Sequence, residues 1–375
     1  MKTVLTGGRV LLDGGFAENC PILWEDGVIL ALDDDGDASV ADRVIDAKGL
    51  TVLPGLVDVH THGRAGYDFN TATEEQMVRM KRDYAVHGVT TVFATLASDT
   101  AEGWRRSISN IQQSGYDGIH FEGRYLNAGK RGAHAADLLV PLDAAELESF
   151  LHQIHIPCHI SAAYELDTDG SFSEVAKRHG ATMGLGHTMA TAEQAHTAIA
   201  RGVVSFTHLF NAMPALHHRE GGAVSVALCG DGFGELICDG MHVCPDVIAL
   251  AYRCLGNDKT VLITDSMEAT GCSDGEYAIA GQPVLVKNGK ALTLDGALAG
   301  STLDLWDGVK NLMRFADLSL ESAVLCATRN PARMVGLDSK VGSIAVGKRA
   351  DLIAVDTQNL TIECVIANGE AVCGF

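Results

Sequence analysis

Long apolar segments and an excess of positive charge are both missing from this sequence. No stretch of the 375 residues approaches the ~20 apolar residues that a membrane-spanning helix needs. The N-terminal sequence MKTVLTGGRVLLDGG has no apolar segment of the kind found in signal peptides. Lys and Arg number 28 against 48 Asp and Glu, and the resulting net charge of −20 repels nucleic acids and anionic lipids. We therefore expect a soluble, cytoplasmic protein with no nucleic-acid or membrane partner.

Paired cysteines are also missing. The ten cysteines are scattered and none forms a Cys-x-x-Cys motif, which argues against a structural zinc site and against a redox site. In a cytoplasmic protein they should be reduced and mostly buried. The length suits one large domain with a smaller one. A content of 47% apolar and 20% charged residues is typical of globular proteins.

Both ends of the chain read as short strands joined by turns. Residues 1–50 contain three such segments, punctuated by Gly-Gly and Asp-Gly, and residues 341–375 return to the same pattern. Chain termini often lie close together. We therefore expect a small β-sandwich domain built from residues 1–52 and 345–375.

The middle of the chain, residues 53–344, alternates apolar runs with helix-like segments. The runs lie at residues 53–62, 88–97, 118–123, 156–162, 181–187, 203–208, 235–242 and 260–265. They lack polar alternation, which is typical of parallel strands buried on both faces. Between them lie helix signals, such as Thr73 at a capping position with Gly88 at the far end, and residues 322–336 predict one more helix.

Eight strand–helix units predict an α/β protein with a (β/α)8 TIM-type barrel. A doubly wound parallel sheet is the alternative fold. Such a sheet commonly carries a glycine-rich phosphate loop, which this sequence lacks, so the closed barrel is favoured.

Polar residues stand at the ends of most of these runs, where barrel enzymes carry their active sites. His60 and His62 end the first run, and their spacing of two turns both side chains to one face, with Asp58 below them. A His-x-His pair alone is weak support for a ligand site. Further candidates end other runs: Glu122, His187, His208, Asp239, His242 and Asp265. Together they predict a metal site.

Imidazole and carboxylate ligands suit zinc, iron or manganese better than a soft metal. Bound zinc lowers the pKa of a water ligand to about 7, so such a site favours hydrolysis at neutral pH. Asp265 is the expected proton shuttle, because a carboxylate beside an activated water can pass a proton to a leaving nitrogen. A ligand-only or structural role for Asp265 is the alternative.

One loop, THLFNAMPALHHREGG (207–222), gathers candidate anion contacts. It contains Asn211, His217, His218 and Arg219, and the planar guanidinium of Arg is suited to phosphate. A solvated basic turn is the alternative reading. The histidines on helix-like segments are expected at the surface: His87, His152, His155, His179 and His196.

The sequence resembles the N-acetylglucosamine-6-phosphate deacetylase family of the amidohydrolase superfamily. The motifs that carry the resemblance span nearly the whole chain in the family's order: PGLVDVHTHG, GIHFEG, LNAGKRGAH, GLGHTMA, FTHLFNAMPALHHREGG, ICDGMHV, LITDSMEATG, LAGSTLDLWDGVKNL and NPARMVGLDSKVGSIAVGKRADLIAVD. The THLFNAM and HHRE segments are far more specific than His-x-His, whereas GKRADLIAVD alone would indicate only the superfamily.

The resemblance implies roles for individual residues. Glu122, His187 and His208 match the main metal ligands, and His60 with His62 match a pair that some members use for a second metal. One or two divalent ions per subunit are therefore expected, zinc ahead of iron or manganese. Asp265 matches the catalytic acid/base. The sugar, its phosphate and the developing oxyanion are contacted in the family by residues matching His134, Asn211, Ala212, Arg219 and His242.

The implied reaction is hydrolysis of the acetamide of an N-acetyl hexosamine 6-phosphate, with N-acetylglucosamine 6-phosphate as the expected substrate. The products would be acetate and the amino sugar 6-phosphate. In the family the residue matching Arg219 reaches across a dimer interface, which implies a homodimer. Two departures stand near the site: Arg124 and Tyr164 replace the usual prolines. Arg124 could contact an anion or pair with an acid, and both changes bear on the choice of sugar.

Other functions stay open. N-acetylgalactosamine 6-phosphate could be the substrate. A cyclic amide, a dipeptide or a base would suit relatives that bridge two metals with a carboxylated lysine, but the fourth run, IPCHISA, has no lysine. A sugar-phosphate sensor on a decayed barrel, without turnover, is the non-enzymatic alternative. Such decay should remove metal ligands or the catalytic acid, yet Glu122, His187, His208 and Asp265 are all present.

Overall fold

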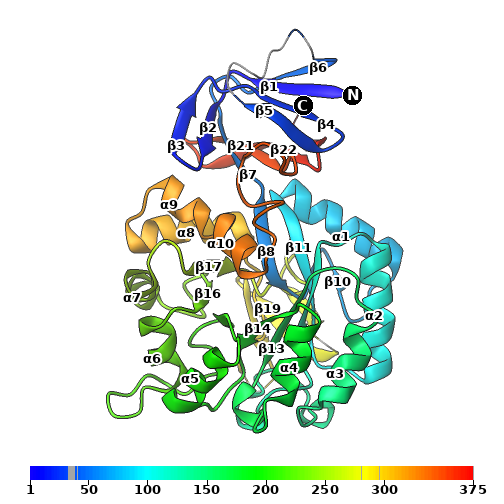
Figure 1. Ribbon diagram of the computed structural model, residues 1–375, viewed down its shortest axis with the longest axis vertical. Coiled ribbons are helices and arrows are strands. Elements are labelled where there is room, and N and C mark those ends of the chain that lie inside the picture. Colours follow the sequence, from blue (N-terminus) through cyan, green and yellow to red (C-terminus); the bar gives the residue numbers. More distant parts are fainter. Residues whose placement is uncertain (33–38, 40, 280, 295, 375) are drawn as a thin grey trace.

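An eight-stranded parallel sheet forms a nearly closed barrel in the lower part of Figure 1. This is a computed structural model, and it describes residues 1–32, 39, 41–279, 281–294 and 296–374. In spatial order the strands are β8 (Leu56–Thr61), β11 (Val89–Leu96), β12 (Gly118–Glu122), β13 (Cys158–Ala162), β14 (Thr182–Leu185), β15 (Ser205–Phe206), β16 (Phe233–Ile237) and β17 (Thr260–Ile263). Each overlaps one of the eight apolar runs. The TIM-type barrel is thus confirmed, and the doubly wound alternative is wrong.

The first and last strands of the barrel meet beside the candidate site. The backbone N–H of Asp265 donates to the carbonyl of His60 at 2.9 Å. At the opposite end, Val57 of β8 donates to Ala327 and Leu262 of β17 donates to Cys326, each at 2.8 Å. The barrel is therefore closed directly at one end and through residues 326–327 at the other.

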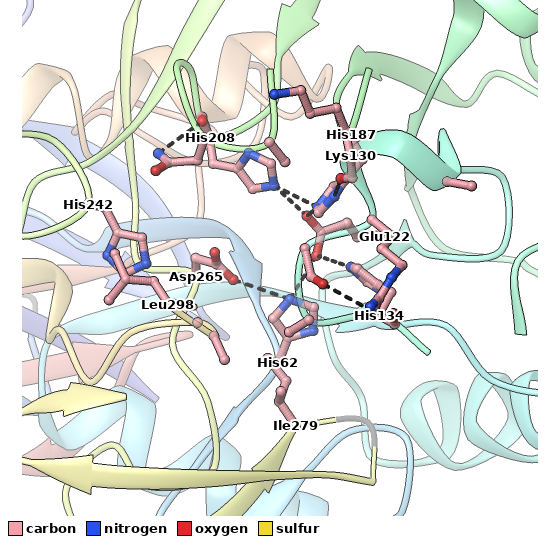
Figure 2. Close-up of a pocket in the computed structure, with 18 of the residues that line it drawn as sticks. His62, Glu122, Lys130, His134, His187, His208, His242, Asp265, Ile279 and Leu298 are labelled. Atoms are coloured by element: carbon pink, nitrogen blue, oxygen red, sulfur yellow. Dashed lines mark hydrogen bonds and ion pairs between the residues drawn. The ribbon is translucent and has the colours of Figure 1, made fainter. Parts of the chain in front are cut away.

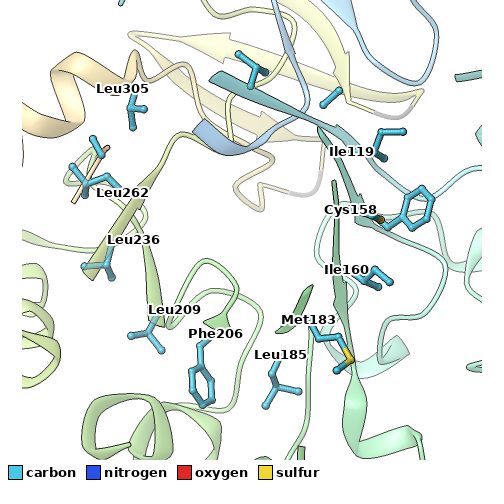
Figure 3. Close-up of a cluster of buried hydrophobic side chains, with 14 of the residues drawn as sticks. Ile119, Cys158, Ile160, Met183, Leu185, Phe206, Leu209, Leu236, Leu262 and Leu305 are labelled. Atoms are coloured by element: carbon cyan, nitrogen blue, oxygen red, sulfur yellow. The ribbon is translucent and has the colours of Figure 1, made fainter. Parts of the chain in front are cut away.

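Helices surround the barrel and pack on the outward face of its strands (Figure 1). They are α1 (Glu74–Val86), α2 (Ala101–Gln113), α3 (Ala144–Leu151), α4 (Ser171–Arg178), α5 (Ala192–Ala200), α6 (Gly222–Cys229), α7 (Pro245–Leu255), α8 (Leu305–Ala316), α9 (Leu320–Leu325) and α10 (Arg329–Met334). Thr73 caps α1 and forms a reciprocal capping box with Gln76, as its position predicted. Figure 3 shows part of the apolar core between these two layers, including Ile160, Leu185 and Leu236.

The single helix expected over residues 322–336 is wrong. The segment forms two short helices, α9 and α10, separated at Cys326–Thr328. Pro331 explains the break, because proline in a helix interior removes a backbone donor and clashes with the preceding turn. A helix that restarts at Arg329 places Pro331 in its first turn, where the missing N–H costs little.

The N-terminal residues form one further sheet, and residues from both chain ends form another; both are drawn above the barrel in Figure 1. One contains β5 (Val28–Leu32), β4 (Ile22–Glu25), β1 (Lys2–Thr6) and β6 (Arg43–Asp46); the other contains β23 (Glu370–Cys373), β22 (Thr361–Ala367), β21 (Leu352–Asp356), β7 (Thr51–Pro54), β2 (Arg9–Leu12) and β3 (Gly15–Glu18). β21 pairs antiparallel with β7, which joins the two ends of the chain. The sheets share an apolar core that includes Trp24 and Leu352. This is the expected β-sandwich, although residues 341–347 add no strand to it.

An additional three-stranded sheet lies beside the mouth of the barrel and was not expected. It contains β18 (Gly275–Ile279), β19 (Gln282–Lys287) and β20 (Lys290–Thr293), and follows β17 in the chain. A two-stranded pair, β9 (Gly63–Arg64) with β10 (Tyr67–Asp68), follows β8. Alternating burial in β19 and the turn Asn288–Gly289 before β20 are ordinary hairpin signals.

Two remaining expectations concern membranes and cysteines. None of the helices among the described residues is long and apolar enough to cross a bilayer. Five of the ten cysteines are buried: Cys20, Cys158, Cys238, Cys326 and Cys364. Half of the cysteines are therefore buried, rather than most of them as expected.

Candidate metal centre and active site

The barrel strands bring six buried titratable side chains together at their C-terminal ends. Glu122 is the last residue of β12, and His60 lies within β8. The other four follow their strands within two residues: His62, His187, His208 and Asp265. Figure 2 shows five of these side chains, all but His60, converging on one space. The structure thus brings together all five expected metal ligands and the expected proton shuttle, Asp265.

Glu122 stands at the centre of this cluster, and its two oxygens face different imidazoles. Oε1 lies 2.8 Å from Nε2 of His208 and 3.1 Å from Nε2 of His187. Oε2 lies 2.9 Å from Nε2 of His62 and 3.2 Å from Nε2 of His60. Asp265 lies on the Oε2 side, with Oδ1 at 3.2 Å from His62. One carboxylate therefore separates two imidazole pairs.

Several of these residues occupy a strained backbone conformation. His187, His208 and Asp265 have φ angles of 45°, 32° and 49°, in the left-handed region that residues other than glycine rarely adopt. Such residues cost roughly 1–3 kcal/mol each and cluster at functional sites. After Glu122 the chain turns at Gly123, where a Cβ would lie 2.4 Å from the backbone nitrogen of Ser98. The backbone is shaped to aim these side chains inward.

The cluster keeps its carboxylates ionised. Burial alone would raise the pKa of Glu122, but the imidazoles of His60, His187 and His208 outweigh it and hold that pKa well below its usual range. Burial likewise opposes ionisation of Asp265, and its neighbours His60 and His62 bring the pKa of Asp265 below its ordinary value. Both groups therefore present negative oxygens at neutral pH.

The donor set fits one or two divalent ions. His187 donates Nδ1–H to the carbonyl of Lys130 at 2.7 Å, so its Nε2 carries the lone pair and faces Nε2 of His208 at 3.0 Å. Two candidate groups share Glu122: one with His187 and His208, the other with His60, His62 and Asp265. Within each group, one possible ligand atom per residue lies within 4.8 Å of the others. Nδ1 of His60, His62 and His208 makes no hydrogen bond within the described part of the chain.

His134 supplies a neutral donor to the same space. The backbone N–H of Ser98 donates to its Nδ1 at 3.3 Å, which leaves the proton of a neutral ring on Nε2. That nitrogen lies 3.9 Å from Oε2 of Glu122. Burial, reinforced by the neighbouring His187, lowers the pKa of His134 to about 3. The ring thus stays uncharged and presents an N–H.

His242 is held by an acidic partner. Its Nδ1 lies 2.7 Å from Oδ2 of Asp239, and its backbone N–H donates to Oδ1 of the same carboxylate at 2.9 Å. Burial would raise the pKa of Asp239, but the contacts with His242 bring it below its usual value. Asp239 therefore fixes the ring, and Nε2 is the nitrogen left for a ligand.

A pocket of about 450 Å³ opens beside the cluster. The expected site residues that line it are His62, Glu122, His134, His187, His208, Asn211, Ala212, His242 and Asp265. Ile279 and the segment Leu298–Gly300 close one side, and residues 128–133 close another. His60 lies beneath this surface, fully buried.

Arg219, His217 and His218 lie apart from the pocket. All three are exposed, and the guanidinium of Arg219 contacts Nε2 of His218 at 2.9 Å. None of them lines the pocket of its own chain. Whether Arg219 holds a phosphate stays a prediction, as does its reach across a dimer.

Arg124 and Tyr164, which replace the prolines usual in the family, also lie away from the pocket. Arg124 is buried; it pairs with Glu146 at 2.6 Å and donates to the carbonyl of Asp99 at 2.6 Å. Of the two roles expected for Arg124, pairing with an acid is the one observed. Tyr164 is buried and donates to the carbonyl of Ile160 at 3.2 Å.

Sequence reasoning missed the groups that orient the site. Lys130 acts through its backbone carbonyl and Ser98 through its backbone N–H, and neither contribution leaves a signal in residue type. The pairing of Asp239 with His242 could have been predicted, because the two residues lie close together in a turn after a strand. Aspartate side chains commonly accept hydrogen bonds from backbone N–H groups two or three residues further along the chain.

Comparisons with known proteins agree with this arrangement. A profile of the amidohydrolase family matches residues 51–372. The chain belongs to the amidohydrolase family. N-acetylglucosamine-6-phosphate deacetylase from Vibrio furnissii is 34% identical over 93% of this chain and 92% of its own. N-acetylgalactosamine-6-phosphate deacetylase from Escherichia coli O157:H7 is 33% identical over 95% of this chain and 96% of its own.

Solved structures extend the similarity to the whole fold. N-acetylglucosamine-6-phosphate deacetylase from Pasteurella multocida superposes with a TM-score of 0.92, at 25% identity and 99% coverage of both chains. A variant of the enzyme from Mycobacterium smegmatis, in complex with N-acetyl-D-glucosamine-6-phosphate, gives a TM-score of 0.90 at 31% identity, again covering 99% of each chain.

Proposed function

We propose that this chain is a metal-dependent deacetylase that hydrolyses the acetamide of an N-acetyl hexosamine 6-phosphate, with N-acetylglucosamine 6-phosphate as the preferred substrate. The observation that carries the proposal is Glu122 standing between two imidazole pairs, with Asp265 beside it in one pocket. Relatives named for this activity cover nearly the whole chain, and one solved relative holds the substrate.

The ions of this proposal would be held by Glu122 with His187 and His208, and by Glu122 with His60 and His62. Zinc is the preferred ion, ahead of iron or manganese, because imidazole and carboxylate ligands suit these metals. A divalent ion in such a site polarises a carbonyl oxygen and lowers the pKa of a water molecule. The amidohydrolase membership and the donor set support a divalent metal in general.

Asp265 is the group that moves protons in this proposal. Its carboxylate is ionised at neutral pH, so it can accept a proton from the attacking water. The resulting carboxylic acid can then donate that proton to the amine nitrogen as the C–N bond breaks. The products are acetate and the amino sugar 6-phosphate.

Two histidines would stabilise the oxygen on which negative charge develops. His134 presents a neutral Nε2–H, and His242 is held by Asp239 with Nε2 free for a ligand. Preorganised donors of this kind contribute more to the transition state than to the ground state, because they need not reorganise as charge appears.

The phosphate group would lie at the loop that contains Asn211 and Ala212, both of which line the pocket. Arg219 of a second subunit would complete this contact, since the Arg219 of the same chain is exposed outside the pocket. A homodimer follows from this part of the proposal. The cytoplasmic location expected from the sequence stays a prediction.

A second substrate is favoured by one observation: the relative from Escherichia coli O157:H7 is named for N-acetylgalactosamine 6-phosphate and is almost as similar. The two sugars differ in the configuration of one hydroxyl group.

The test is a substrate panel. Purified protein of measured metal content is offered the 6-phosphates of N-acetylglucosamine, N-acetylgalactosamine and N-acetylmannosamine, with unphosphorylated N-acetylglucosamine as the control. We expect acetate from the glucosamine ester at the highest kcat/KM and far less from the unphosphorylated sugar. Failure to release acetate from any phosphate ester would reject the proposal, and binding without turnover would favour a sensor.

A further inference from the structure

Below the cluster, the floor of the barrel contains a carboxylate that the proposed reaction does not use. Glu235 lies within β16 and is fully buried. The charged groups paired with it among the described residues are imidazoles, those of His60 and His159, and neither lysine nor arginine is among them. A buried carboxylate is costly unless it is paired and hydrogen-bonded.

The two oxygens of Glu235 are unequally satisfied. Oε1 accepts a hydrogen bond from the hydroxyl of Ser205 at 2.7 Å and lies 3.6 Å from Nε2 of His159. Oε2 is buried and makes no hydrogen bond with the described residues. The ring nitrogen nearest to it is Nδ1 of His60, at 3.7 Å, which is also buried without a hydrogen bond.

His60 thus stands between two acidic groups. Its Nε2 faces the cluster, 3.2 Å from Glu122 and 3.5 Å from Asp265, while Nδ1 faces Glu235 on the other side. At 3.7 Å, Nδ1 and Oε2 lie just outside hydrogen-bond range of each other. Histidines that bind metal through one nitrogen commonly donate the other N–H to a carboxylate or carbonyl, which fixes the ring and strengthens it as a ligand.

The opposite imidazole pair already has such a contact within the cluster. His187 donates Nδ1–H to the carbonyl of Lys130 at 2.7 Å. On the side of His60 and His62, Glu235 occupies the equivalent position but is a carboxylate, so it also adds negative charge behind the ligand. The two candidate ion positions therefore depend on different supporting groups.

We propose that Glu235 is a positioning residue that orients His60 and thereby determines whether the chain retains an ion on the His60–His62 side of Glu122. The proposal rests on the metal centre of the proposed function and deepens it. In this proposal, a residue buried beneath the pocket, and not the pocket lining itself, determines whether the chain binds one ion or two.

Metal binding can be measured without any assay of turnover. Wild-type protein, Glu235→Gln and Ser205→Ala are stripped with a chelator and titrated with Co²⁺, and the visible absorption and the metal content after dialysis are recorded. Ser205→Ala is the matched control, because it removes a hydrogen bond from Oε1 and leaves the Oε2–His60 pair in place.

We expect two ions per wild-type chain and a second-ion affinity that falls about 10- to 100-fold in Glu235→Gln, as loss of such outer contacts commonly does. The affinity for the first ion should be unchanged, which also shows that the variant is folded. Ser205→Ala should resemble wild type. If Glu235→Gln cannot be recovered folded, Glu235→Asp carries the test: it keeps the charge but withdraws the carboxylate from His60, so it should also lose the second ion.

Two-ion binding by Glu235→Gln with unchanged affinities would overturn the proposal, as would a wild-type chain that takes up only one ion at saturating metal. Either result can be obtained from protein that still releases acetate, so the proposed function would survive it. A wild-type chain that binds no metal at all would overturn both.

Discussion

At the scale of single residues, the contacts of Nδ1 decide what Nε2 of His187 and of His134 presents to the site. His187 donates Nδ1–H to the carbonyl of Lys130, whereas Nδ1 of His134 accepts from the backbone N–H of Ser98. Nε2 of His187 is therefore left with a lone pair, whereas Nε2 of His134 is left with a proton. Residue type and position in the sequence cannot distinguish these two outcomes.

The proton relay assigned to Asp265 can be tested by a change of one atom. Asp265→Asn should keep its fold and most of its metal but lose about 10²–10⁴-fold in kcat, since general acid–base catalysis is commonly worth that much. Metal content and steady-state rates of acetate release are the measurements.

Asp246→Asn is the matched control, because Asp246 is exposed in the first turn of α7. It should turn over like wild type. Turnover near the wild-type rate in Asp265→Asn would show that the relay lies elsewhere.

His120 makes stability depend on pH. Burial, helped by the imidazoles of His60 and His159, lowers the pKa of His120 well below its usual value. In the unfolded chain the ring binds a proton near pH 6.5, while the folded chain leaves it neutral. Stability is therefore lost as the pH falls below about 6.5, by up to about 1.4 kcal/mol per pH unit.

Replacing His120 with Asn should flatten that decline. We expect the thermal midpoint of metal-loaded His120→Asn to fall less than that of wild type between pH 6.5 and 5.0. His196→Asn, a change of an exposed histidine on α5, is the control and should follow wild type. Parallel curves for His120→Asn and wild type would contradict the assignment.

At the scale of elements, the loop after β12 is fixed by contacts to the layer outside the barrel. Arg124 joins this loop to Glu146 of α3 and stacks near Trp104, with its guanidinium carbon 5.8 Å from the ring centre. Tyr125 donates to the other oxygen of Glu146 at 2.8 Å. These contacts hold the loop that directly follows Glu122.

Arg124→Ala should therefore destabilise the fold without changing substrate binding directly. Removing one partner of a buried pair costs about 3–5 kcal/mol, and Glu146 is partly exposed, so we expect the low end of that range. Thermal unfolding and KM are measured together. A KM raised more than a few fold in protein that is still folded would indicate that Arg124 contacts substrate.

Most elements could be predicted from the sequence because their signals are local. Thr73 with Gln76 marks the start of α1, and the eight apolar runs mark buried parallel strands. The break before Pro331 was missed because an apolar helical pattern continues across it. The sheet β18–β20 was missed because a regular alternation of strands and helices does not predict a hairpin between β17 and α8.

At the scale of the whole molecule, the site was predictable because the C-terminal ends of all strands of a parallel barrel lie on one side. Once the strands were placed, the meeting of Glu122, His187, His208 and Asp265 followed from topology. Glu235 was missed for the opposite reason: it begins the run at 235–242 and lies in the middle of β16, away from the strand ends that carry the expected site residues. The division into residues 1–52 with 345–375 and residues 53–344 remains a prediction.

Arg219 connects the site to the assembly of the protein. If it holds the substrate phosphate, Arg219→Ala should raise KM about tenfold or more and change kcat little, because the phosphate is remote from the broken bond. If it acts across a dimer, an equal mixture of Arg219→Ala and Asp265→Asn chains, assayed at substrate concentrations well below KM, should regain about a quarter of wild-type activity, since half of the dimers then contain one intact site.

The mixture must be unfolded and refolded together so that subunits exchange. Each variant refolded alone is the control and should stay impaired. A mixture no more active than its components would place Arg219 in its own chain's site or outside the reaction.

In the proposed function, Glu122 and its imidazole neighbours enclose a divalent ion. Anomalous diffraction from crystals of zinc-loaded protein, recorded on both sides of the zinc absorption edge, tests it most directly. We expect a strong peak bounded by Glu122, His187 and His208, and a second peak beside His60 and His62. Crystals without zinc at Glu122, in which these side chains point away from one another, would contradict it.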